Sequence, residues 1–370
     1  MGSKILFVGV DVDDKSFKAA ALEEAGDEYS HFVTAPASVY LIKKLKSFES
    51  QGYEVRVCYE ATFLGFSLYR DIAMAGIKCD VIAPSLIPDL AGKKVKTDRL
   101  DAQKLAKYYR ANLLTRVEVP DEEDEAARDF IRARKRIVLQ LVETKNYINA
   151  QCRRLGWNYK SECTRKALWT DHHERWLDQK VNECERVTVA RQVALLMRHY
   201  QYLKNLIEEF NQEVETLSEK PKYKARVDAL NCFRGLSTLS SLTITVELGD
   251  IKRFKHPAHL VGYVGLNVIE YSSGGRERKF GVSCMGNRHV RTTVVEAAQL
   301  AMRTPKVNRS LRSRRDGVET EITMIADRCM ARLYTKGTRL LMRDKNRNKV
   351  KVACAREMIG FIWEALNKVS

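Results

Sequence analysis

The stretch "KILFVGVDVD" (residues 4–13) decides how the N-terminal part of the chain folds. It is a short, nearly continuous run of apolar β-formers that ends in acids, which is typical of a strand buried at the centre of a sheet. "FKAAALEE" (residues 17–24) and "HFVTAP" (residues 31–36) predict two further strands. The chain is therefore expected to begin as a three-stranded meander.

Helices and strands alternate in the part that follows. Residues 38–50 and 66–75 have helical patterns, and the second of these is closed by a glycine. "EVRVCYEAT" (residues 54–62) and "KCDVIAP" (residues 78–84) predict a fourth and a fifth strand. A meander followed by alternating helices and strands indicates a layered α/β domain, which we place at residues 1–120.

Acids stand at the ends of these elements. Asp11 ends the first strand, Glu60 ends the fourth, and Asp98 and Asp101 lie three residues apart on the helix predicted from "VKTDRLDAQKL" (residues 95–105). Sites in layered α/β folds form at the carboxyl ends of central strands. Four carboxylates converging there would repel one another unless a cation neutralised them, and all-oxygen ligation suits Mg²⁺ or Mn²⁺. Acids at Asp98 and Asp101 also suit the first turn of a solvated helix, so that reading stays open.

The chain is strongly basic. Its 370 residues carry a formal charge of +17, and residues 303–351 alone hold 15 Lys and Arg against 5 Asp and Glu, a net +10. A protein this basic usually binds a polyanion, and nucleic acid is the default expectation. The cations that we expect to contact nucleic acid are Lys93, Lys94, Lys96, Arg276, Arg278, Lys279, Arg288, Arg312, Arg314 and Arg315.

Several other classes of protein are disfavoured. The nine cysteines are odd in number and scattered, with no C-x-x-C, which argues against a disulfide framework and for a reducing cytosol. His256 and His259 have no second ligand pair that would make a zinc site. No apolar run approaches the ~20 residues of a membrane span, and the N-terminus enters a strand directly, so we expect a cytoplasmic, nucleoid-associated protein.

The middle of the chain, residues 121–220, has a different pattern. After an acidic run, "DEEDE", apolar residues recur at steps of three and four, which predicts a coiled-coil seam between two long helices that form an antiparallel hairpin or a dimerising arm. Between the helices lie Trp157, Trp169 and Trp176, for which packing in a helical tip is favoured over stacking on bases.

Residues 221–370 are predicted to form a mainly helical domain. Residues 230–250 indicate a helix, a tight glycine turn and a helix, and basic helices end the chain. Between them lies "EYSSGGRERK" (residues 270–279), whose backbone N–H groups and cations could receive a phosphate. It is either a flexible basic loop on a DNA backbone or a loop in which one serine is a nucleophile.

The motifs together resemble a known family. "GVDVDDKSF", "CYEAT", "KTDRLDA", "ELGDIKRF", "YVGLNVIEYSSGG" and "GNRHVRTTVVEAA" follow one another as in the insertion-sequence transposases of the IS110 family, the DEDD transposases described as bridge-RNA-guided serine recombinases. The resemblance implies an RNase H-type, RuvC-like domain, a coiled-coil arm, and a transposase domain with a helix-hairpin-helix-like element. It also implies that Asp11, Glu60, Asp98 and Asp101 bind metal and that Ser273 is the nucleophile, with Ser272 as an adjacent alternative.

Two departures from the family pattern stand out. Phe63 follows "EAT" where the family often has glycine, and "FRGLS" keeps Gly235 but has Ser237 in place of the second glycine of the hairpin turn. The second change weakens the expectation that this turn grips a phosphate.

The expected function is DNA strand exchange through a phosphoserine link, assisted by Mg²⁺ or Mn²⁺. The resemblance implies donor and target DNA and a noncoding bridge RNA as partners, and a dimer of dimers as the assembly. Two alternatives remain: a RuvC-like junction endonuclease that uses metal-activated water, and a non-catalytic nucleic-acid scaffold.

Overall fold

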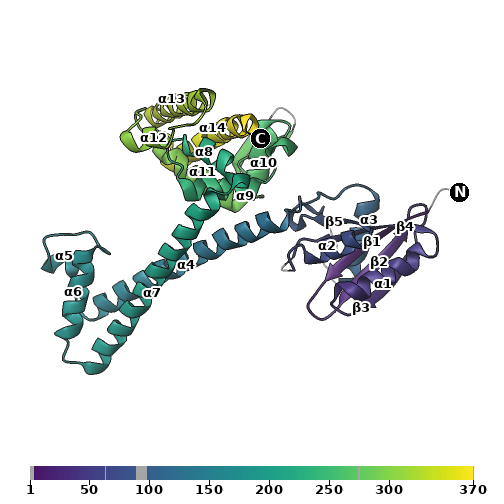
Figure 1. Ribbon diagram of the computed structural model, residues 1–370, viewed down its shortest axis with the longest axis horizontal. Coiled ribbons are helices and arrows are strands. Elements are labelled where there is room, and N and C mark those ends of the chain that lie inside the picture. Colours follow the sequence, from purple (N-terminus) through teal and green to yellow (C-terminus); the bar gives the residue numbers. More distant parts are fainter. Residues whose placement is uncertain (1–3, 63, 89–97, 274–275, 370) are drawn as a thin grey trace. The chain divides into compact units, whose positions relative to one another are not determined.

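The computed structural model describes residues 4–62, 64–88, 98–273 and 276–369 (Figure 1). Phe63, Lys93, Lys94 and Lys96 lie outside these ranges. The chain divides into two compact units, Met1–Pro120 and Asp121–Ser370, each with its own hydrophobic core.

The first unit is built on a five-stranded sheet in the order β3-β2-β1-β4-β5. β1 (Lys4–Val12), β2 (Phe17–Glu23) and β3 (Tyr29–Thr34) form the antiparallel meander, and β4 (Tyr53–Glu60) and β5 (Lys78–Ile82) run parallel to β1. The prediction of five strands, with the apolar run of β1 at the centre, is confirmed. Seven β1 residues and their β4 partners lie in continuous register, from Lys4↔Tyr53 to Val10↔Tyr59.

Helices cover both faces of this sheet. α1 (Ser38–Glu49) and α2 (Ser67–Met74) pack on one face, where Val10 and Tyr59 are fully buried. A 3₁₀ turn (Pro84–Leu86) follows β5, and α3 (Asp98–Arg110) packs on the other face. The mixed α/β architecture predicted for this part of the chain is therefore confirmed.

Gly9 determines how closely α3 approaches the sheet. A Cβ atom on Gly9 would collide with the backbone of Ala102 and Ala106 and would lie 2.7 Å from the Cβ of Leu105. The helix axis thus passes directly over β1 at the one strand position without a side chain. No larger residue fits there unless α3 moves away.

The second unit begins with a pair of long antiparallel helices, α4 (Glu122–Arg154) and α7 (Val187–Ser218). Phe130 of α4 and Phe210 of α7 are 4.7 Å apart between ring centroids. Farther along, Ile148 of α4 packs with Tyr200 of α7. The antiparallel hairpin is the observed arrangement within the chain, and a coiled-coil supertwist stays a prediction.

Two short helices, α5 (Tyr159–Glu162) and α6 (Asp171–Asn182), lie at the tip of this pair. Trp157, Trp169 and Trp176 belong to one apolar cluster there, with Ile148 and Tyr200 of the long helices. Trp176 is 7% exposed. The predicted packing role of the tryptophans is confirmed.

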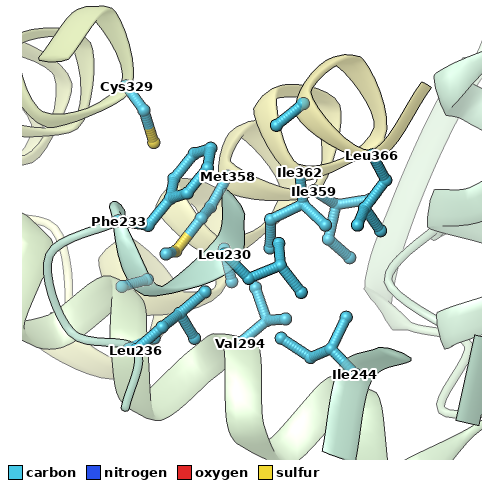
Figure 2. Close-up of a cluster of buried hydrophobic side chains, with 14 of the residues drawn as sticks. Leu230, Phe233, Leu236, Ile244, Val294, Cys329, Met358, Ile359, Ile362 and Leu366 are labelled. Carbon is cyan, nitrogen blue, oxygen red and sulfur yellow. The ribbon is translucent and has the colours of Figure 1, made fainter. Parts of the chain in front are cut away.

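The rest of the second unit is a helical core that carries one β-hairpin. Figure 2 shows side chains from α8, α9, α11, α13 and α14 meeting in this core, among them Leu230, Ile244, Val294 and Met358. The elements are α8 (Pro221–Asn231), α9 (Thr238–Leu248), a 3₁₀ turn (Ile251–Arg253), α10 (Pro257–Val264), β6 (Val268–Ser273), β7 (Arg276–Val282), α11 (Arg288–Ala301), α12 (Arg309–Ser313), α13 (Thr320–Met342) and α14 (Arg347–Lys368).

Of the helix, turn and helix expected over residues 230–250, the turn at Gly235 and the second helix, α9, are observed. The first helix, α8, lies earlier than expected and ends at Asn231. The basic helices at the end of the chain are α12 to α14. A helix-hairpin-helix role for α8 and α9 stays a prediction, as does a domain boundary between residues 220 and 221.

The close approach at Gly9 can be tested by adding one methyl group. Gly9→Ala should destabilise the first unit by about 1–3 kcal/mol, because the methyl group overlaps helix backbone and α3 must shift. Thermal unfolding and amide hydrogen exchange in α3 would measure the change.

Gly360→Ala is the matched control. A Cβ there meets no atom within 4 Å, and the position is inside helix α14. Alanine should be neutral or stabilising there by about 0.5–1 kcal/mol. Unchanged melting and unchanged exchange in α3 for Gly9→Ala would contradict the packing described above.

Candidate active site

Asp11 and Glu60 lie side by side at the carboxyl ends of two parallel strands. The register of β1 and β4 ends at the pair Val10↔Tyr59, and the two acids are the next residue on each strand. Val10 and Tyr59 point into the core under α1 and α2. Because side chains alternate along a strand, Asp11 and Glu60 face the side covered by α3. Both acids are half-buried.

Helix α3 runs antiparallel to β1. Its middle, at Ala102 and Ala106, contacts Gly9. Its last residue, Arg110, donates a 3.0 Å hydrogen bond to the carbonyl of Glu23, and Glu23 is paired with Leu6 near the start of β1. The N-terminal turn of α3 therefore points toward the carboxyl end of β1.

The first turn of α3 reaches the level of Asp11. Asp98 precedes Ala102 by four helical residues, or ~6 Å along the axis. Asp11 follows Gly9 by two strand residues, or ~7 Å. The backbone of the first turn of α3 and the end of β1 thus reach the same edge of the unit. Asp101 is half-buried and precedes Leu105, which is buried against the sheet, by one turn.

Carboxylates are the ligands that Mg²⁺ and Mn²⁺ prefer, so the residue types at this edge suit such an ion. The side chain of Asp98 lies outside the described part of the structure. Among the side chains that are described, no three or more His, Cys, Asp or Glu residues are grouped closely enough to hold a metal ion. Asp11, Glu60 and Asp101, whose side chains are described, do not form such a group. The four-acid site therefore stays a prediction, for which only the positions of the backbone elements speak.

The predicted nucleophile lies in the β-hairpin of the second unit. Ser273 is the last residue of β6 and is paired with Arg276, the first residue of β7, while Ser272 is paired with Glu277. The side chains of residues 271–279, which include Arg278 and Lys279, lie outside the described part. The roles of Ser273, Ser272 and the three cations of the hairpin stay predictions.

The described cations divide into two kinds. Arg288, at the start of α11, and Arg312, in α12, are exposed. Arg314 donates to the carbonyl of Leu236, and Arg315 donates at 3.0 Å to the carbonyl of Cys232 and pairs with Asp327 at 2.8 Å.

Arg314 and Arg315 therefore tie the segment after α12 to the turn between α8 and α9. Replacing either residue would remove internal contacts as well as charge. Contact of these two residues with nucleic acid stays a prediction.

Sequence reasoning missed one buried acid, Glu247 in α9. It is 1% exposed and accepts two 2.9 Å hydrogen bonds from Arg132 of α4 and one of 2.7 Å from Asn287. One signal was available, because Glu247 is the only acid in the apolar stretch "LTITVEL" (residues 242–248), and a buried acid requires a partner.

No helix in the described residues is long and apolar enough to cross a membrane.

Two family models match the chain. A DEDD transposase model matches residues 8–155, the range that holds all four predicted metal-binding acids, and its domain is RuvC-like. A model described as the transposase IS116/IS110/IS902 family matches residues 227–312, which include Ser273, Glu247 and Asn287.

Relatives match over most of the chain. A Sinorhizobium fredii protein called transposase y4qE is 35% identical over 96% of this chain and 87% of its own length. The transposase of insertion sequence element IS1533 from Leptospira borgpetersenii is 30% identical over 68% of this chain and 73% of its own length. The transposase of IS1111A from Coxiella burnetii is 24% identical over 82% of this chain and 79% of its own length.

A transposase acts on DNA, which it cuts and rejoins, and this agrees with the basic composition of the chain. A DEDD-type domain typically uses divalent metal ions. From the two models and the long matches, the chain belongs to the IS110 family of insertion-sequence transposases.

Proposed function

We propose that this transposase exchanges DNA strands through a phosphoserine link at Ser273, and that Asp11, Glu60, Asp98 and Asp101 hold the divalent cations that assist the reaction. The observation that carries the proposal is the antiparallel course of α3 over Gly9. This course supports the proposal because the backbone of the first turn of α3 and the carboxyl ends of β1 and β4 then reach the same edge of the unit.

The proposed reaction conserves the phosphodiester bond energy. The Oγ of Ser273 forms a bond to phosphorus, the bond from phosphorus to the 3′-oxygen breaks, and the 3′-oxygen leaves with a proton as a 3′-hydroxyl. The serine proton passes to a base at the site, such as a carboxylate. A 3′-hydroxyl of a partner strand then reverses the step. No ATP is needed, in agreement with the lack of a G-x-x-x-x-G-K-[ST] loop in the sequence.

The acids and the serine have separate tasks. When bound, a divalent cation would stabilise negative charge on the phosphoryl group and favour ionisation of a serine that is a poor nucleophile at neutral pH. The four carboxylates would hold that ion. Ser273, the last residue of β6, would supply the nucleophilic hydroxyl.

The choice of DNA sites is proposed to come from a noncoding bridge RNA. The net charge of +17, concentrated in residues 303–351, supports binding of polyanion backbones without reading bases. Base pairing by the RNA would then select the sequence, while cations such as Arg288 and Arg312 would hold backbones.

Removal of the serine hydroxyl gives a direct test. Ser273→Ala should abolish the denaturation-resistant protein–DNA adduct and leave DNA and RNA binding within about threefold, because only the nucleophile is lost. The adduct is measured by denaturing electrophoresis with end-labelled DNA.

Ser272→Ala is the neighbouring control and should keep the adduct. If only Ser272→Ala removes it, the nucleophile is Ser272. Persistence of the adduct in both variants would rule out the serine mechanism, and metal-dependent cleavage without any adduct would favour the junction endonuclease.

The acids predict a dependence on divalent cations. Asp11→Asn, Glu60→Gln, Asp98→Asn and Asp101→Asn should each lower strand cleavage by at least about 100-fold, because each removes a charged ligand. Mg²⁺ should raise the melting temperature of the wild type, since it binds the folded site and relieves repulsion between carboxylates.

Asp14→Asn serves as the control, because Asp14 is an exposed acid in the turn after β1. It should leave cleavage and the Mg²⁺-dependent stabilisation intact. Full activity in EDTA, together with melting that ignores Mg²⁺, would argue decisively against the metal site.

Strand exchange also requires several strands to be cut in one complex, so we propose a dimer of dimers. Asp98 and Ser273 belong to different compact units. If different chains of the assembly supply them for one reaction, Asp98→Asn and Ser273→Ala proteins, each inactive alone, should partly restore recombination when mixed.

The mixing experiment has a clear negative result. If each chain used only its own acids and serine, every reaction would lack one of the two groups, and mixing would restore nothing. A single 42.4 kDa chain in the nucleic-acid-bound state, measured by light scattering, would contradict the assembly itself.

A further inference from the structure

Glu247 is a buried carboxylate that the proposed chemistry does not use. Its charge is balanced by Arg132, whose Nε and Nη2 donate to the two carboxylate oxygens at 2.9 Å each. Burial opposes ionisation, but the hydrogen bonds and charge of Arg132 and the amide of Asn287 outweigh it and hold the pKa of Glu247 below its usual range. Glu247 is therefore an ionised carboxylate inside a largely apolar core.

The same residue contacts the two elements that flank the β-hairpin. Asn287 donates from Nδ2 to the Glu247 carboxylate at 2.7 Å, and the hydroxyl of Tyr263, in α10, donates to the Glu247 backbone carbonyl at 3.2 Å. Asn287 is also the N-cap of α11, where its Oδ1 accepts from the backbone N–H of His289 and Val290 at 3.0 Å. Both the nitrogen and the oxygen of the Asn287 side-chain amide are therefore hydrogen-bonded.

These elements form the base of the hairpin. The chain leaves α10 at Gly265, forms β6 and β7, and enters α11 after Asn287. The backbone N–H of Asn287 donates to the Tyr263 carbonyl at 2.8 Å. Gly286, with a φ of 106°, lies so close to Tyr263 that any Cβ would collide with its carbonyl oxygen.

One further bond closes the base. The N–H of Ser283 donates to the carbonyl of Asn267 at 2.8 Å, just outside the strand pairing. The direction in which β6 leaves this base determines where its last residue, Ser273, lies. A shift of the N-terminus of α11 relative to α10 would therefore move Ser273.

We propose that Glu247 is a positioning residue: through Asn287 and Tyr263 it fixes the base of the β6–β7 hairpin, and through Arg132 it anchors that base to the first turns of α4. The consequence for catalysis rests on the proposed role of Ser273. The anchoring itself does not, because it concerns only the hairpin and four helices, α4, α9, α10 and α11.

Hydrogen exchange tests the anchoring without DNA. Glu247→Gln keeps the shape and removes the charge, and Asn287→Ser keeps an N-cap acceptor while removing the donor to Glu247. Each should speed amide exchange in β6 and β7 by about tenfold or more, because local opening becomes easier. Exchange in α13 and α14 should change by less than about twofold in both variants.

Glu357→Gln is the matched control. Glu357 pairs with Arg332 at 2.8 Å and with Lys336 at 2.7 Å between α14 and α13, and neither partner belongs to the hairpin base. It should leave exchange in β6 and β7 unchanged. If Glu247→Gln and Asn287→Ser leave hairpin exchange unchanged, or if Glu357→Gln raises it equally, the proposal is wrong.

A kinetic measurement separates positioning from binding. With saturating DNA, Glu247→Gln should slow adduct formation by about 100-fold while DNA affinity stays within about threefold, since misplacement of a nucleophile by about 1 Å has effects of that size. Glu247→Asp, which keeps the charge, should recover part of the rate. Equal losses of rate and affinity in Glu247→Gln, without rescue, would indicate general destabilisation and overturn the positioning role.

The two proposals can fail separately. If Ser273→Ala keeps the adduct, the proposed function fails, and the exchange experiment still decides whether Glu247 anchors the hairpin. If Glu247→Gln does not fold, Asn287→Ser decides in its place, because it leaves the Arg132–Glu247 pair intact.

Discussion

The backbone contact between α3 and Gly9 is the constraint on which the candidate site depends. Without a Cβ at this position, the helix lies directly on the central strand, and its antiparallel course carries its first turn to the edge where Asp11 and Glu60 end their strands. The sheet itself separates two apolar cores, one under α1 and α2 and the other under α3. A sheet with both faces covered leaves its carboxyl edge as the place where polar groups can gather.

The second unit is organised around a charge instead of a close backbone contact. A buried ion pair contributes little net stability compared with apolar residues of similar size, because desolvation offsets the attraction. Stability is therefore a weak reason for burying Glu247 beside Arg132, whose side chain stays 43% exposed. The pair instead fixes the orientation of the Glu247 carboxylate, because the guanidinium of Arg132 donates two parallel hydrogen bonds to it. The same carboxylate also accepts from Asn287, the N-cap of α11.

Much of the first unit was predictable, because its signals are local. The runs at residues 4–13 and 54–62 are strands by periodicity alone, and acids at strand ends suggest a site at one edge. The course of α3 was not predictable in this way, since it depends on Gly9 meeting a helix about 90 residues later in the chain. Glu247 and Arg132 are likewise 115 residues apart in sequence. A count of charges also does not show that Arg314 and Arg315 donate to backbone carbonyls of the α8–α9 turn, because those contacts join residues about 80 apart in sequence.

The acidic run at the start of α4 holds this helix against α8. Asp121 caps the helix and pairs with Lys222 at 2.6 Å. Asp124 accepts a hydrogen bond from the hydroxyl of Tyr223 at 2.9 Å. One helical turn later, Arg128 donates to the carbonyl of Val246, the residue before Glu247. The first turns of α4 are thus bound to α8 and α9 by a series of polar contacts that ends at Arg132. The same helix, α4, continues to Arg154 near the tip formed by α5 and α6. Arg132 and Glu247 therefore connect this long helix to the base of the hairpin. If Ser273 is the nucleophile, as we propose, these contacts at the start of α4 would help the β6–β7 hairpin hold one position while DNA strands are exchanged.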